Sequence, residues 1–210
     1  MKATHPLTRP LPLTDLPPEV TGEDREIAAL AALARAELPV ASVVVVPAAV
    51  EERFYRLNNL PHRLNEVFAT VDPRDPDEDD VEEAAPAAEA LIARHYLLDE
   101  FIDDFYAATR PLPSMLRVRR PEQEGEPAAR GRESLLALKR AYQRDWSFDA
   151  VWGRLEGRGA IALEARPVLL HGADDGDAPA SLVERAAAAL GREVALRVTG
   201  SGRIAGVRLR

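Results

Sequence analysis

The stretch GEDREIAALAALARAELPVASVVVVPAAVEERF, residues 22–54, decides the fold. From Ile27 to Leu38 its apolar residues recur at spacings of three and four, which predicts a helix with one face in the core. Thr21 precedes an acidic first turn, where carboxylates favour the positive end of a helix dipole. Thr21 is therefore the expected N-cap of this helix.

Pro39 ends the helix, because the residue before a proline is disfavoured in the α region. The valines at 40 and 43–46 then form a β-branched run that is too short for a helix and is apolar on both faces. Such a strand normally lies inside a sheet covered by helices. We expect an α/β or α+β fold with one mixed sheet built from residues 40–46, residues 116–119 and the C-terminal strands.

The remaining pattern divides the chain into three parts. Residues 1–21 are too rich in proline for a helix and predict an extended arm, which either docks on a partner or packs along its own domain or is loose. Residues 22–155 form the main lobe. Residues 156–210 predict a β-α-β-β appendage, with a strand over Ala160–Leu170, a helix over Ala180–Leu190 that Gly191 ends, and a hairpin over Val194–Val198 and Ile204–Leu209.

The segment Leu30–Val40 and the valine strand resemble the opening of the nucleotide-binding domain of phosphoenolpyruvate synthase and pyruvate, phosphate dikinase. That family begins with the pattern G-G-K-x-x-x-L-x-x-L-x-x-A-G-L-P-V-P-x-G-F-V-V. Residues Leu116–Arg120 and the helix over Glu133–Trp146 are similar to the family's V-R-S-S-A strand and the helix that follows it. The resemblance covers residues 22–152 and implies the N-terminal lobe of an ATP-grasp-like domain.

The chain departs from this family at the residues that contact the nucleotide. The position of the family's lysine falls on Glu26, and the paired serines are replaced by Arg120 and Pro121. Arg119 matches a phosphate-contacting position in kind. Phosphoryl transfer in the family also needs a second lobe with metal-binding carboxylates and a swivelling phosphohistidine domain. The resemblance thus implies a non-catalytic or degenerate module without catalytic residues, with weak binding of a nucleotide (ATP with Mg²⁺) or another anion near Arg119.

The residues themselves also point to an anion. Arg117 and Arg119 lie two apart on a predicted strand and share one face, and planar guanidinium donors suit phosphate. Residues 110–158 hold ten arginines and one lysine against seven acids, whereas residues 71–104 hold 13 acids and two arginines. Arg117 and Arg119 are therefore the candidate ligand-binding residues. The alternative is a salt-bridged strand paired with the acidic helix, through Asp103 or Asp104.

Two sequence patterns resemble metal sites, but neither supplies a complete set of ligands. The alternating aspartates of residues 75–79 follow the start of a calcium loop, but the template's glycine and terminal glutamate are missing. His95, Asp99 and Asp103 would line up on one helix, yet a single helix seldom completes a site. His171 falls in a predicted loop without a second ligand or a serine elbow. We expect neither a metal nor a catalytic site.

Composition narrows the classes of function. The chain has 210 residues, 46% of them hydrophobic, a net charge of -8 and no cysteine, which excludes disulfides and thiol chemistry. Its acidity disfavours nucleic acid, and no apolar run approaches the ~20 residues that cross a bilayer. The proline-rich start lacks the features of a signal peptide, so we expect a cytoplasmic protein.

Three functions stay open at this stage. The first is the degenerate nucleotide- or anion-binding module. The second is a protein that binds a partner or itself, using the leucines of the arm, Leu7, Leu11, Leu13 and Leu16. The third is a small enzyme, for which four scattered histidines supply no acid-base constellation.

Overall fold

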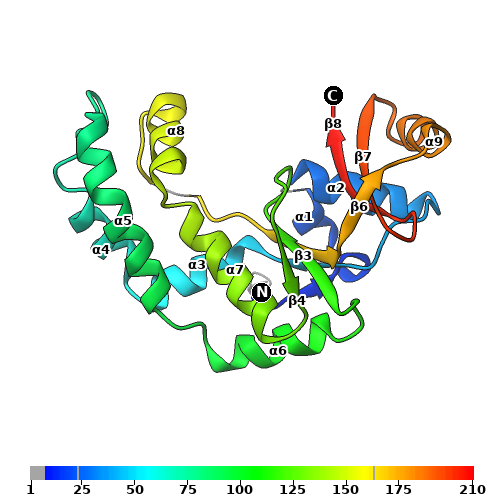
Figure 1. Cartoon of the computed structure of the whole chain (residues 1–210), viewed down its shortest axis with the longest axis horizontal. Helices are drawn as coiled ribbons and strands as arrows, with labels where there is room; N and C mark the ends of the chain where they lie inside the picture. Colours follow the sequence, from blue (N-terminus) through cyan, green and yellow to red (C-terminus); the bar gives the residue numbers. More distant parts are fainter. Residues whose placement is uncertain (1–7, 23, 163) are drawn as a thin grey trace, which may run out of the picture.

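The computed structural model describes residues 8–22, 24–162 and 164–210. Figure 1 shows a U-shaped molecule, with helices α4, α5 and α8 in one arm and α9 with β6, β7 and β8 in the other. The elements are β1 (Leu11–Pro12), the 3-10 helix η1 (Leu13–Asp15), α1 (Pro18–Thr21), α2 (Arg25–Arg35), β2 (Val43–Val46), α3 (Ala48–Leu57), α4 (Leu60–Val67), α5 (Glu78–Arg94), α6 (Asp99–Thr109), β3 (Met115–Arg119), β4 (Glu126–Ala129), α7 (Arg132–Arg144), α8 (Phe148–Arg158), β5 (Val168–Gly172), β6 (Asp174–Asp177), α9 (Ala180–Leu190), β7 (Val194–Thr199) and β8 (Ile204–Leu209).

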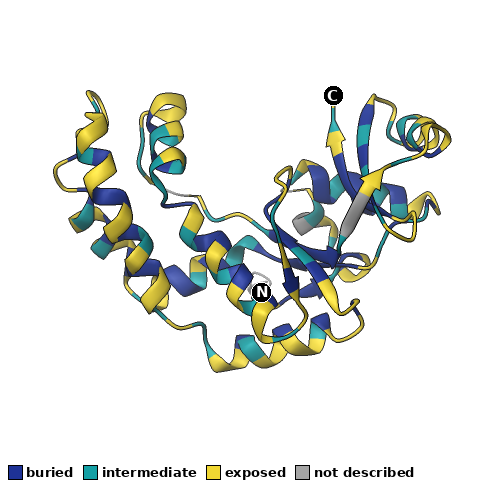
Figure 2. Cartoon of the chain, viewed as in Figure 1, coloured by how far each residue is buried: buried dark blue, intermediate teal, exposed yellow. Residues whose placement is uncertain are grey.

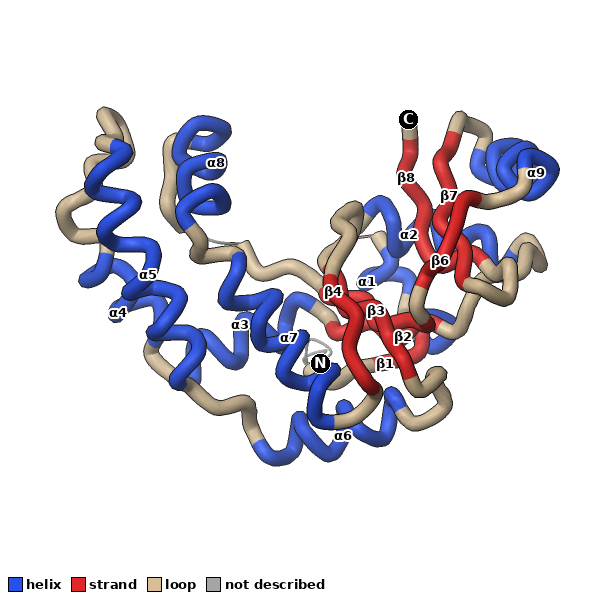
Figure 3. Tube along the Cα trace, viewed as in Figure 1, coloured by secondary structure: helices blue, strands red, loops and turns tan. Residues whose placement is uncertain are grey.

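Two antiparallel sheets form the strand framework, which places the chain in the α+β class. The larger sheet has the order β1-β2-β5-β3-β4, and the smaller has the order β6-β7-β8. Figure 3 shows both sheets in the same half of the molecule, beside the helical arm. The predicted single mixed sheet is wrong. The apolar runs that suggested it reflect burial on both faces and do not specify strand direction.

Side chains alternate across β2 and supply two cores. Val44 and Val46 pack with α3, α4, α5 and α7, whereas Val43 and Val45 pack with α2, α9 and the smaller sheet. All four valines are at most 3% exposed. The larger sheet is therefore covered on both faces, as predicted, and buried residues follow its strands in Figure 2.

The N-terminal segment packs on its own sheet. β1 pairs with β2, with Leu11 opposite Val45, and Leu13 and Leu16 are buried in the core that α2 covers. Residues 11 and 12 are extended and packed on the chain's own sheet, in line with one of the two predicted alternatives, whereas the helical turns η1 and α1 were not predicted. Leu7 lies outside the described residues.

Helix α2 begins later than predicted, because Asp24 and not Thr21 is its N-cap. The Asp24 carboxylate accepts the backbone N–H groups of Glu26 and Ile27 at 2.9 and 3.1 Å. The hydroxyl of Thr21 instead donates to carbonyls of the preceding turn. This start places Glu26 on the buried face of α2, beside Ile27 and Leu30.

The segment predicted as an appendage supplies the central strand of the larger sheet. β5 lies between β2 and β3, so Leu170 stands opposite both Val44 and Val118. The strand begins at Val168, later than predicted. Helix α9 and strands β7 and β8 then form as predicted, whereas β6 lies in the segment predicted as a loop, and Gly191 ends α9 in the left-handed conformation. Residues 156–210 thus continue the core of the preceding lobe.

Candidate functional site

Arg119, a predicted ligand-binding residue, is 2% exposed, between α2, β5 and β8. Its two Nη atoms donate to the two carboxylate oxygens of Glu26 at 2.6 and 2.8 Å. Its Nε donates to Nε2 of His171 at 2.9 Å, and its Nη atoms also reach the carbonyls of Ala205 at 3.0 Å and Arg120 at 3.4 Å. The five N–H groups of this guanidinium therefore meet five acceptors from the chain itself.

Glu26, at the position of the family's lysine, is the counter-ion of Arg119. Its carboxylate also accepts the backbone N–H groups of Val207 at 3.0 Å and Glu122 at 2.6 Å. Burial by itself raises the pKa of Glu26, but hydrogen bonds and the charge of Arg119, together with these two backbone donors, hold the pKa below its ordinary value of 4.5. Glu26 is therefore an ionised, fully engaged carboxylate.

The ion pair also takes the place of a neighbouring strand beside β8. Arg119 donates to the carbonyl of Ala205, and Glu26 accepts from the N–H of Val207, two groups on the outer edge of the smaller sheet. A Cβ on Gly206 would lie 2.9 Å from Nη2 of Arg119 and 3.1 Å from Oε1 of Glu26. The pair therefore requires glycine between its two contacts, and it anchors the smaller sheet to α2 and β3.

The loop that follows β3 closes over Arg119. Gly125 has a φ of +69°, and a Cβ there would lie 2.2 Å from the Cβ of Arg119 and 2.3 Å from the carbonyl of Val118. Glu122 has a φ of 62° and directs its N–H to Glu26. The loop therefore approaches β3 too closely at Gly125 for any other residue, and it supplies one backbone donor to the buried pair.

The lowered pKa of Glu26 predicts a specific response to acid. A carboxyl group whose pKa falls on folding contributes stability above its unfolded pKa, here 4.5, and loses it as the pH falls through the folded pKa. Glu26→Gln should lower the free energy of unfolding at neutral pH and flatten its decline between about pH 5 and pH 3. Urea denaturation at a series of pH values measures both effects.

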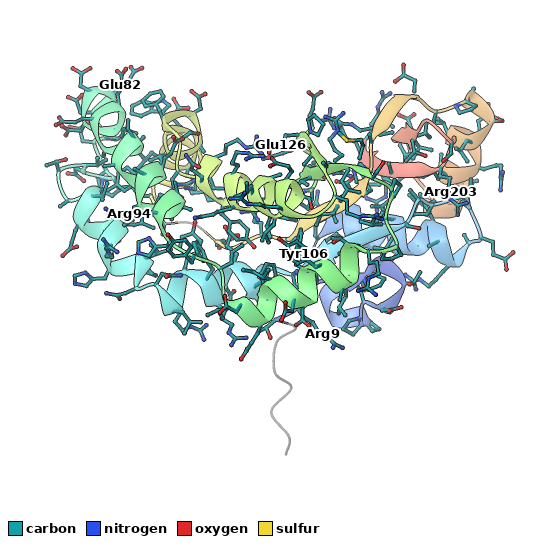
Figure 4. The ribbon with its side chains drawn as sticks, turned by 60° about the horizontal axis from the view of Figure 1, so that its bottom comes forward. Arg9, Glu82, Arg94, Tyr106, Glu126 and Arg203 are labelled. Atoms are coloured by element: carbon teal, nitrogen blue, oxygen red, sulfur yellow. The ribbon has the colours of Figure 1, made fainter. Side chains whose placement is uncertain are left out.

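The matched control is Glu82→Gln, on the exposed surface near the outer end of the helical arm (Figure 4). This variant should keep the decline of the wild type. An equal acid response in Glu26→Gln and the wild type would contradict an ionised Glu26 in the fold.

Arg117, the other predicted ligand-binding residue, is half-buried on β3 opposite His171. Leu116 and Val118 face the core that contains α7, so Arg117 and Arg119 share the other face, as the strand period predicts. The alternative pairing of Arg119 with Asp103 or Asp104 is wrong, because Glu26 of α2 takes that place.

Sequence reasoning did not single out Arg120, whose guanidinium is as deeply buried as that of Arg119. It reaches the side of the larger sheet that α3 and α7 cover, since successive side chains alternate. Its Nη2 contacts Glu51 at 2.7 Å and also Asp145, and its Nη1 contacts the carbonyl of Arg166. The only signal for this role was two adjacent arginines at the end of a strand.

The Arg120 cluster is a set of buried charges. Burial raises the pKa of Glu51 although Arg120 lies beside it, and the nearby Asp145 raises that pKa further. The guanidinium carbon of Arg120 also lies 5.1 Å from the centre of the Tyr142 ring. Arg119 and Arg120 therefore tie β3 to the elements on its two faces, each through buried carboxylates.

A cavity of about 660 Å³ lies between α7, α8 and the loop after β3. The carboxylates that border this cavity are those of Glu124, Asp145, Asp149 and Glu164. The arginines that line it are Arg119, Arg120, Arg144, Arg154, Arg158 and Arg166. Six arginines and four carboxylates thus face one cavity wall.

Neither His95 nor His171 lines this cavity. Helix α5 ends at Arg94, so His95 does not continue in line with Asp99. The Nε2 of His95 accepts from Arg63 at 2.8 Å. His171 lies on β5 and not in the predicted loop, and it is buried beside Arg119. Within residues 8–22, 24–162 and 164–210, no group of three histidine or carboxylate side chains could hold a metal ion.

No family model matches this chain, and no curated protein matches it. The likeness to the phosphoenolpyruvate synthase family therefore stays a prediction from the residues quoted above. Among the helices of the described part of the chain, none has both the length and the apolar character needed to span a membrane.

Proposed function

We propose that this chain is a non-catalytic binding module related to the nucleotide-binding lobe of the phosphoenolpyruvate synthase family, in which Glu26 takes the place of a bound phosphate at Arg119. One observation carries the proposal: Glu26 meets Arg119 with both carboxylate oxygens, at 2.6 and 2.8 Å. A carboxylate presents two oxygens to a guanidinium in the way that a phosphate does.

ATP with Mg²⁺ does not fit at Arg119. A phosphate there would displace Glu26, and separating the partners of a buried ion pair costs about 3–5 kcal/mol. The displaced carboxylate would also lose the N–H groups of Val207 and Glu122. Arg119 therefore serves to hold α2, β3 and β8 together, and we assign no nucleotide chemistry to it.

Thermal unfolding with and without millimolar Mg-ATP tests this proposal. We expect the melting temperature to change by the same amount in the wild type and in Arg119→Lys, because Arg119 does not contact the nucleotide. A ligand at ~100 times its Kd stabilises by about 2.7 kcal/mol, a shift of several degrees for a chain of this size. Such a shift in the wild type that disappears in Arg119→Lys would overturn the proposal.

A protein partner, or a second copy of the chain, is the other candidate function. Leu57 at the end of α3 is 56% exposed and Tyr96 after α5 is 85% exposed. Both border one shallow depression between α3 and the α5–α6 connection. The leucines of the N-terminal segment, by contrast, are buried in the chain's own core at positions 11, 13 and 16.

A further inference from the structure

Arg154, on the cavity side of α8, is a partly buried cation that lies 5.1 Å from the centre of the Trp146 ring and donates hydrogen bonds to two carbonyls. Its Nε donates to Ile161 at 3.1 Å and its Nη1 to the carbonyl of Asp145 at 2.5 Å. Its Nη2 is buried and has no hydrogen-bond partner among the described residues. A buried donor of this kind costs free energy unless an acceptor reaches it.

Other arginines surround this unmatched donor. Burial lowers the pKa of Arg154, and the charges of Arg166 and Arg158 lower it further, against the opposing effect of Asp145. The Nε of Arg120, whose side chain is 1% exposed, also lacks a hydrogen-bond partner among the described residues and belongs to a residue of the cavity wall. Several arginines thus line one cavity.

The floor of the cavity is bare helix backbone. Gly153 and Gly157 lie one turn apart on α8 and both line the cavity. Glycine inside a helix is unfavourable relative to alanine. A Cβ at either position would have no atom within 4 Å, so packing within the described chain does not explain these glycines. Such positions allow a ligand to approach the backbone closely.

Arg158, on the rim of the cavity, is held by a pair that a ligand can exchange. Arg158 meets Glu164 at 3.3 Å, with the two side chains 65% and 83% exposed. Arg166 is 43% exposed and meets Asp145, which it shares with Arg120. The exposed Arg158–Glu164 pair contributes little to stability, so an anion of higher charge competes with it well, whereas Asp145 is 9% exposed and belongs to the buried Arg120 cluster.

We propose that this cavity binds a small anion that carries a phosphate group, with Arg154 and Arg158 as its main contacts and the Gly153–Gly157 face of α8 beneath it. Planar guanidinium donors match phosphate oxygens in pairs. A volume of about 660 Å³ is that of a small-molecule site and holds anything from pyrophosphate to a nucleotide. Arg119 also lines the cavity, but the proposed contacts lie on α8, so the site does not depend on the role proposed for the Arg119–Glu26 pair.

Titration calorimetry of the full chain in buffer without divalent metal tests the site, using pyrophosphate, inorganic phosphate and ATP as separate ligands. We expect pyrophosphate to bind and Arg158→Gln to weaken it about tenfold or more, the value of a charge-assisted hydrogen bond. Gly153→Gln should weaken it similarly by filling the floor. Because glutamine favours a helix over glycine, this variant should melt no lower than the wild type.

The matched control is Arg140→Gln, which removes an exposed α7 arginine paired with Glu126 and should leave the affinity unchanged. Tighter binding of ATP than of pyrophosphate would identify a nucleotide as the source of the phosphate. Equal binding would identify the phosphate group alone. Absence of heat with all three ligands at millimolar concentration, or equal weakening in Arg158→Gln and Arg140→Gln, would overturn the proposed site.

Discussion

Arg120→Ala is expected to lower the free energy of unfolding by about 3–5 kcal/mol. The substitution leaves Glu51 and Asp145 close together in a buried site without the guanidinium that both contact. It also removes the cation beside the ring of Tyr142. Since domains of this kind are stable by only about 5–15 kcal/mol, this one change removes a large share of the total.

Urea denaturation followed by tryptophan fluorescence measures the loss, because Trp146 is buried in the same core. Arg140→Ala is the control: its side chain is 44% exposed, and loss of such a pair is expected to cost at most about 1 kcal/mol. If Arg120→Ala does not fold, Arg120→Lys keeps the charge and should show a smaller loss. Equal losses in Arg120→Ala and Arg140→Ala would contradict a buried charge cluster.

Glu26→Ala is expected to cost a similar amount, about 3–5 kcal/mol, for the same physical reason. It leaves the guanidinium of Arg119, a residue that is 2% exposed, without its counter-ion, and it leaves the N–H of Val207 without its acceptor. The loss of local stability should be largest in β7 and β8, because the ion pair lines the outer edge of their sheet. Hydrogen exchange should therefore accelerate in residues 204–209 more than in α7.

Glu82→Ala, an exposed substitution on α5, is the control for this variant and should leave exchange in β8 unchanged. Uniform acceleration along the whole chain in Glu26→Ala would contradict a local anchoring role. In that event, Glu26 would act through global stability alone.

Local patterns predicted most of the secondary structure. The helix and strand of residues 22–54 form as α2 and β2, and the C-terminal helix and hairpin form as α9, β7 and β8. The N-cap of α2 and the directions of the strands were harder to predict from the sequence. Asp24 and Thr21 are both good caps, and only the observed hydrogen bonds distinguish them. A valine run on β2 indicates burial on both faces for either strand direction.

The candidate site was harder to predict, because its partners are remote in sequence. Arg119 was identifiable as a candidate phosphate-binding residue, but its partner Glu26 lies 93 residues away in the sequence. Glu26 was notable only because the resembling family has a lysine at that position. Arg120 meets Glu51 across 69 residues. Such contacts depend on how β3 packs between the elements that cover the two faces of the larger sheet. Arg154 gave no sequence signal, since its meaning comes from an unmatched donor beside two helix glycines.

A double-mutant cycle between Glu26 and Arg119 tests the central claim most directly. The cycle compares the free energies of unfolding of the wild type, Glu26→Gln, Arg119→Met and the double variant. If Glu26 is the true occupant of Arg119, the coupling free energy should reach about 2–3 kcal/mol, as for groups in one buried network. A coupling below about 0.5 kcal/mol, the value of an exposed pair, would contradict the account and leave Arg119 available to an external ligand.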